Sequence, residues 1–116
     1  MRVSGGPRFS SQYGRFIRHA GHDALVFCQV GRFVEFYGPQ RLLATAALRL
    51  VRVTIARAGF GFSVGFPPRL RQAYIARAVR VGCTVVEVRE VDRLRRTCVA
   101  RQVVSIWIPA NCAAGP

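Results

Sequence analysis

The sequence predicts a mixed α/β fold, in which about three helices pack against a single sheet of about six strands. Three observations support this prediction. Apolar, β-branched runs alternate with stretches whose apolar residues follow helical spacing. Glycine and proline separate these stretches. The chain has 116 residues and is 51% hydrophobic, so it suits one domain that can bury a core.

The first helix is expected after a flexible N-terminal segment, residues 1–9, which contains glycine and arginine. Ser10 or Ser11 can cap this helix, and Gly21 can end it. Its apolar side is formed by residues at helical spacing, namely Tyr13, Phe16, Ile17 and Ala20.

Two strands and a second helix follow. The nearly continuous apolar run Ala24–Val30 predicts a buried strand, and Gly31-Arg32 is a turn signal before a second strand, Phe33–Tyr37. Gly38-Pro39 ends that strand and begins a helix, because proline is favoured in the first helical turn. The apolar side of this helix contains Leu42, Leu43, Ala46 and Ala47.

The middle of the chain predicts two more strands and the clearest helix. Leu50–Ile55 is β-branched, and Gly59–Phe66 alternates aromatic and small residues, so both are expected to be strands. Pro67-Pro68 opens a helix that runs to about Val81, where Gly82 can cap it. The stripe expected to be buried comprises Leu70, Ala73, Tyr74, Ala78 and Val81.

The last part of the chain predicts a hairpin. Cys83–Val91 and Cys98–Ile108 are apolar runs expected to be strands, joined by a charged turn at Asp92–Arg96. Pro109 ends the second strand, and residues 111–116 form a tail. The folded domain is therefore expected over residues 10–110.

The charge balance indicates a polyanionic partner. There are 18 basic residues, all of them arginine, against five acidic ones, which gives a net charge of +13. A field of this sign attracts nucleic acid, and the planar arginine fork suits phosphates and base edges. Codon bias could explain arginine in place of lysine, but it does not explain the shortage of acids.

The cysteines and histidines do not form a pattern typical of a metal site or a catalytic site. Cys28, Cys83, Cys98 and Cys112 form no C-x-x-C pair, so no metal site or cofactor is expected. His19 and His22 have no nucleophile or carboxylate pair near them in sequence, so no catalytic residue and no enzymatic activity are expected. Without an apolar signal core or a run of membrane-spanning length, a cytoplasmic location with reduced thiols is expected, and no membrane partner.

The segment from Gly31 to Tyr37 is the strongest candidate for a binding site. Alternation along a strand places Phe33, Glu35 and Tyr37 on one side. Because an unpaired carboxylate is costly to bury, we expect that side to be the wetter one. An exposed phenylalanine beside a turn can act as a wedge between bases. In the alternative, Phe33 is a core residue and Glu35 pairs with an arginine.

A longer series of motifs resembles the N-terminal domain, domain I, of the MutS DNA mismatch repair family. Phe27–Gly38 is similar to that family's mismatch-recognition motif, whose centre is Gly-Asp-Phe-Tyr-Glu. Gly65-Phe66-Pro67 with Tyr74 in the following helix resembles its Gly-Ile-Pro element. Further similar elements are Val81–Val88 and Arg101–Pro109, so that the resemblance covers about Gln12 to Pro109.

The resemblance implies a MutS domain I-like fold and recognition of mismatched or distorted double-stranded DNA. In that family the motif phenylalanine stacks on a mispaired base from the minor groove, and the motif glutamate hydrogen-bonds that base. By position these roles fall on Phe33 and Glu35. The other expected DNA-binding residues are Arg32, Tyr37, Arg69 and Arg71.

This sequence departs from the family in three respects. Arg32 stands where the family usually has aspartate, and Pro68-Arg69 replaces a usual aromatic-His pair. The sequence contains no phosphate-binding G-x-x-x-x-G-K-[ST] loop, and we expect the chain to lack the family's parts that clamp DNA, dimerise and hydrolyse ATP. A protein partner would have to supply those functions.

Two alternatives remain open. Gly59-Phe60-Gly61-Phe62 resembles part of the core motif of the RNA-recognition-motif family, which stacks bases on an open sheet. A protein-interaction module derived from the MutS domain would expose a large apolar patch instead. The sequence also leaves open whether mismatched duplex, ordinary duplex or single strands are preferred.

Overall fold

The computed structural model of the chain describes residues 2–3, 9–21, 23–50, 63–95 and 98–110. Within them lie three α-helices, one short 3₁₀-helix and six strands. The helices are α1 (Phe9–Ala20), α2 (Pro39–Leu48), η1 (Pro68–Leu70) and α3 (Arg71–Arg80). The strands are β1 (Arg2–Val3), β2 (Ala24–Val30), β3 (Phe33–Phe36), β4 (Val64–Phe66), β5 (Thr84–Arg95) and β6 (Cys98–Trp107).

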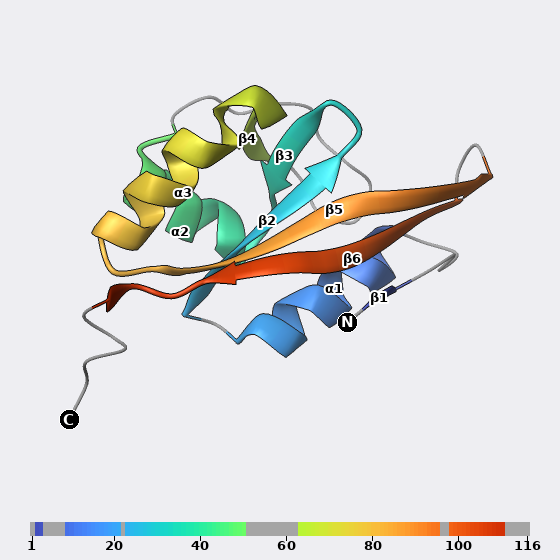
Figure 1. Ribbon diagram of the computed structural model, residues 1–116, viewed down its shortest axis with the longest axis horizontal. Helices are drawn as coiled ribbons and strands as arrows, with labels where there is room; N and C mark the ends of the chain where they lie inside the picture. Colours follow the sequence, from blue (N-terminus) through green and yellow to red (C-terminus); the bar gives the residue numbers. More distant parts are fainter. Residues whose placement is uncertain (1, 4–8, 22, 51–62, 96–97, 111–116) are drawn as a thin grey trace.

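All six strands form one sheet in the order β1-β6-β5-β2-β3-β4. Strands β2 and β5 are parallel neighbours, and every other neighbouring pair is antiparallel. The sheet is therefore mixed, and the predicted fold class is confirmed. Strands β5 and β6 continue past the rest of the sheet as a two-stranded ribbon (Figure 1).

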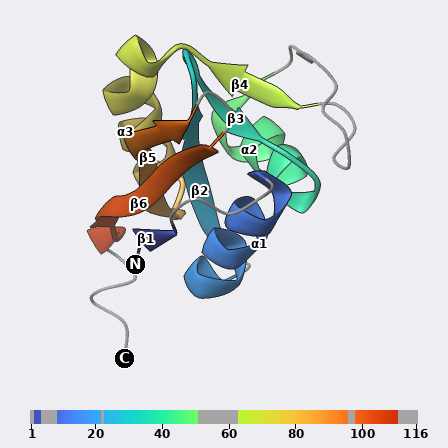
Figure 2. The same ribbon diagram turned by 90° about the vertical axis from the view of Figure 1, so that its right-hand side faces the viewer.

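Helices cover both faces of the sheet. Figure 2 shows α1 and α3 on opposite sides of the sheet. Helix α2 contacts α3 and shares its core cluster. The α1 side contains a core cluster that includes Tyr13, Phe16 and Val26. The α2/α3 side contains a second cluster that includes Phe27 and Phe36. In the described part of the chain, no helix is long and apolar enough to cross a membrane.

The structure differs from the sequence-based prediction at several elements. Arg2–Val3 pairs with β6, although a flexible segment was expected over residues 1–9. Asp92–Arg95 continues β5 instead of turning, because the backbone there goes on pairing with β6. Most of the predicted strand Leu50–Ile55, and the start of Gly59–Phe66, lie outside the described residues.

The helix predicted after Pro67 divides into η1 and α3, and its buried stripe is shifted. Ile75 and Ala78 are buried, whereas Ala73 and Val81 are exposed. Val81 lies just past the last residue of α3, so helical spacing no longer determines its direction. Among the cysteines, Cys28 is buried as expected, and Cys83 is half-buried.

Gly65 allows β4 to lie close to β3. A Cβ atom at this position would clash with the carbonyl oxygen of Val34, far inside van der Waals contact. Only glycine therefore permits the observed pairing of Glu35 with Gly65. This pairing matters for function because it brings the segment after β4 alongside the start of β3.

Candidate nucleic-acid interface

Several segments from distant parts of the sequence meet at one end of the sheet. Strands β2, β4 and β5 run in the same direction and end there or continue beyond it. Val34 pairs with Phe66, so the register places Pro67 alongside Phe33 and starts η1 next to the β2–β3 turn. Figure 2 shows the turn and the β4–η1 connection at this shared end. In open α/β sheets, ligands bind outside the carboxyl ends of strands.

The β2–β3 turn presents an aromatic ring and a positive charge to solvent. Gly31 adopts a left-handed conformation with φ 59°, which glycine allows at no steric cost. Arg32 is exposed, and Phe33, the first residue of β3, is 45% exposed. The prediction that Phe33 is partly exposed at the start of the second strand is therefore confirmed.

Glu35 is buried, which corrects the expectation that its side of the strand is wet. It is only 4% exposed, and the Ser63 hydroxyl donates a hydrogen bond of 3.1 Å to its Oε2. Strand alternation was correct in placing Phe33 and Glu35 on one side, but that side faces the α1 layer. Glu35 can therefore hydrogen-bond a base only if that bond replaces its hydrogen bond with Ser63.

Tyr37 is a core residue, which corrects the expectation that it is a partly exposed aromatic. It is 1% exposed, and its ring packs edge-on against Tyr13 at 5.2 Å between centroids. The Tyr13 hydroxyl accepts a hydrogen bond of 3.1 Å from the backbone N–H of Tyr37. Tyr37 thus fixes α1 to the end of β3 and offers no surface to DNA.

The two arginines expected near η1 differ in their surroundings. Arg69 is exposed on η1, two residues after Pro67. Arg71 is half-buried, and its guanidinium forms an ion pair with Glu87 on β5. Arg71 therefore holds α3 against the sheet, and Arg69 is the one that extends the positive surface beside the turn.

Glu87 is the centre of a buried polar cluster. It is 2% exposed, and it accepts hydrogen bonds from Ser105 and from Arg89. Burial raises the pKa of this carboxyl, but the Ser105 and Arg89 hydrogen bonds and the charges of Arg89 and Arg71 lower it more. The net result is a pKa below its usual value of 4.5, so Glu87 is ionised at neutral pH.

The few acidic residues are mostly turned inward, which makes the exterior more positive than the composition alone suggests. Glu35 and Glu87 are buried, and Glu90 is largely covered. Among the acidic side chains that the structure describes, Asp23 alone is exposed. The exposed arginines among the same residues are Arg15, Arg18, Arg32, Arg49, Arg69, Arg77 and Arg80.

A family comparison agrees with this arrangement. The model of the family described as MutS domain I matches residues 7–115 of the chain. The chain belongs to the MutS domain I family. No curated protein sequence matches it. MutS domain I contributes to mismatch recognition in the MutS proteins, so family membership connects this chain with DNA repair.

The competing RNA-recognition-motif interpretation requires an open sheet face on which bases stack. The central strands do not offer one, because core clusters lie on both of their faces. The aromatic stretch Gly59–Phe62, on which that interpretation was based, lies outside the described residues.

Proposed function

We propose that this domain binds double-stranded DNA and recognises mismatched or distorted sites by inserting Phe33 between bases. The observation that carries the proposal is that Phe33, the first residue of β3 after the β2–β3 turn, is 45% exposed in a chain that matches MutS domain I over residues 7–115. A half-exposed aromatic ring is suited to stacking on a base. A mispair lowers the cost of insertion, because it is already weakly stacked.

The charge around the turn supports approach to a phosphate backbone. Arg32 is adjacent to the wedge in sequence, and Arg69 lies on the neighbouring η1. Because most of the acidic side chains that the structure describes are internal, their negative charge does little to oppose DNA at the surface. Arginine contacts to phosphates position a protein on duplex without reading its sequence. Discrimination must then come from Phe33 and from Glu35.

Glu35 has a conditional role in this proposal. Its carboxylate is held by Ser63 and has no free path to a base in the unbound domain. We therefore assign it the base-accepting role only in the bound state, after the Ser63 hydroxyl has exchanged its hydrogen bond. No ATP hydrolysis enters this function, because binding by the wedge requires none.

The experiment that tests this proposal compares the affinities of the protein for a matched duplex and for the same duplex carrying one mispair, at several salt concentrations. For each phosphate neutralised, log affinity should fall by about 0.9 per unit of log salt on both duplexes. The ratio of the two affinities should change far less with salt, because stacking releases no counterions. Phe33→Ala should reduce that ratio and leave the salt slope unchanged. A ratio of one for the unmodified protein would refute mismatch recognition, and a flat salt response would refute DNA binding.

A further inference from the structure

The β2–β3 turn is supported from behind by a set of side chains that sequence motifs did not single out. The parallel pairing of β2 with β5 runs from Ala24 with Thr84 to Cys28 with Val88. The β2–β5 pairs end at Cys28, shortly before the turn that precedes Phe33. Backbone groups at such a point lose their ladder partners and must be satisfied otherwise.

At this point the backbone groups form hydrogen bonds with side chains instead of with the neighbouring strand. The Gly31 backbone N–H donates a hydrogen bond of 2.8 Å to Oε2 of Glu90. The Glu90 backbone N–H donates one of 3.1 Å to the side-chain oxygen of Gln29. The Gln29 carbonyl accepts one of 3.0 Å from Nε of Arg101. Side chains from β2, β5 and β6 thus replace the missing ladder between β2 and β5.

Arg101 connects these contacts to the interior. It is only 6% exposed, and its Nη2 lies 3.2 Å from Oε2 of Glu90. Its Nη1 donates a hydrogen bond of 2.7 Å to Oε1 of Gln12 on α1. The Gln12 amide in turn donates one of 2.7 Å to the carbonyl of Val99. Because the guanidinium is planar and donates in several fixed directions, lysine could not make these bonds together.

We infer that Glu90 and Arg101 act as a clamp that holds the β2–β3 turn in one conformation and so positions Phe33 for insertion. Both are positioning residues. Neither residue contacts DNA in this proposal, because Arg101 is buried and the Glu90 carboxylate would repel phosphates. The claim that the clamp positions Phe33 for insertion rests on the proposed function. The claim that the clamp fixes the turn is testable without DNA.

A fixed turn matters because an aromatic wedge gains from being ordered before it binds. A turn that samples many conformations loses that freedom on insertion, and the lost entropy weakens binding. The loss falls mainly on the mismatched complex, since the matched complex depends more on phosphate contacts. Loosening the clamp should therefore reduce discrimination more than it reduces affinity for matched duplex.

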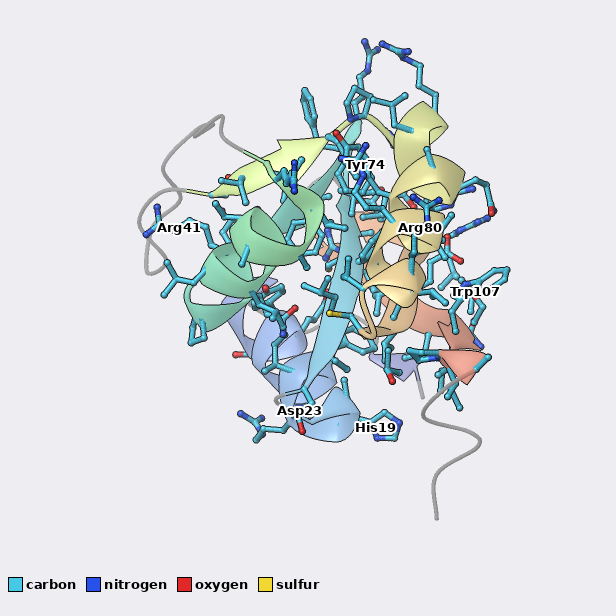
Figure 3. The ribbon with its side chains drawn as sticks, turned by 90° about the vertical axis from the view of Figure 1, so that its left-hand side faces the viewer. His19, Asp23, Arg41, Tyr74, Arg80 and Trp107 are labelled. Carbon is cyan, nitrogen blue, oxygen red and sulfur yellow. The ribbon has the colours of Figure 1, made fainter. Side chains whose placement is uncertain are left out.

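The test uses the full 116-residue chain with Glu90→Ala and the milder Glu90→Gln. Asp23→Asn is the control for the charge change, because Asp23 is an exposed acid at the start of β2. Figure 3 shows it at the opposite end of that strand from the turn. Arg101→Lys tests the second member of the clamp, and thermal melting establishes that each variant folds.

The first measurement is amide hydrogen exchange at Gly31. Losing a hydrogen bond to a charged acceptor should accelerate exchange by about ten- to a hundredfold in Glu90→Ala, with less effect in Glu90→Gln. Asp23→Asn should leave exchange at Gly31 unchanged. Unchanged exchange in a folded Glu90→Ala variant would overturn the clamp, regardless of any result with DNA.

The second measurement is the ratio of affinities for a duplex with one mispair and its matched counterpart. Glu90→Ala and Arg101→Lys should lower this ratio several-fold, while Asp23→Asn should shift both affinities by the same factor. A retained ratio despite faster Gly31 exchange would overturn the positioning role. If the unmodified protein shows no preference, the proposed function fails, and Gly31 exchange alone decides whether the clamp exists.

Discussion

Replacing Phe33 by alanine tests whether this side chain serves binding or stabilises the core. Truncating a fully buried phenylalanine costs about 3–5 kcal/mol of stability. Because Phe33 is 45% exposed, scaling that range by its buried fraction sets a ceiling of roughly 1.7–2.8 kcal/mol. Phe36, fully buried on the same strand, is the matched control and should lose the whole range on truncation.

The assay combines urea denaturation with duplex binding on both variants. Phe33→Ala should remain folded and lose preference for the mispaired duplex, with a change of about ten- to a hundredfold if the ring contributes as much as a good specific contact. Phe36→Ala should lose stability, and its folded fraction should keep the preference. If Phe33→Ala were as destabilising as Phe36→Ala and left the preference intact, the wedge assignment would be refuted.

Three further predictions follow from the same geometry. Glu35→Gln should raise affinity for matched duplex more than for mismatched duplex, and an equal shift on both would remove its base-reading role. Gly65→Ala should lower the free energy of unfolding by about 1–3 kcal/mol in chemical denaturation, because its Cβ would meet the Val34 carbonyl, and an unchanged midpoint would contradict the close approach. Glu87, whose folded pKa is lowered, stabilises the fold above its usual pKa of 4.5 and loses this contribution as pH falls through the folded value. The stability difference between the unmodified protein and Glu87→Gln should therefore shrink below pH 4.5, and a difference that grew on acidification would reverse the sign.

The sequence predicted α1, β2, β3, α2, α3, β5 and β6 in the right order, because apolar periodicity and Gly/Pro boundaries are local signals. Ala24–Val30 and Pro39 demonstrate this, since the strand and the helix begin where predicted. It did not predict the length of β5, because the charged run Asp92–Arg95 has the local composition of a turn and its strand is specified by pairing with β6. Arg2–Val3 is likewise specified by its pairing with β6 and by no local feature.

The candidate site was predicted only in part, for a physical reason. Alternation along β3 assigns Phe33 and Glu35 to one side, but it does not say which helix lies over that side. In the structure Glu35 is buried, whereas Phe33 remains half-exposed because it is the first residue of the strand, beside a turn. In the clamp, Glu90 lies 59 positions from Gly31 in the turn, and Arg101 lies 72 positions from Gln29 on β2, so no local pattern could reveal it.

The central claim is that a positively charged MutS domain I, on its own, distinguishes mispaired from matched duplex through Phe33. The most direct measurement is the ratio of affinities for the two duplexes, in the unmodified protein and in Phe33→Ala, at low and moderate salt. We expect both affinities to fall steeply with salt, the ratio to exceed one in the unmodified protein, and the ratio to approach one in Phe33→Ala. Equal affinities for the two duplexes in the unmodified protein would contradict the account.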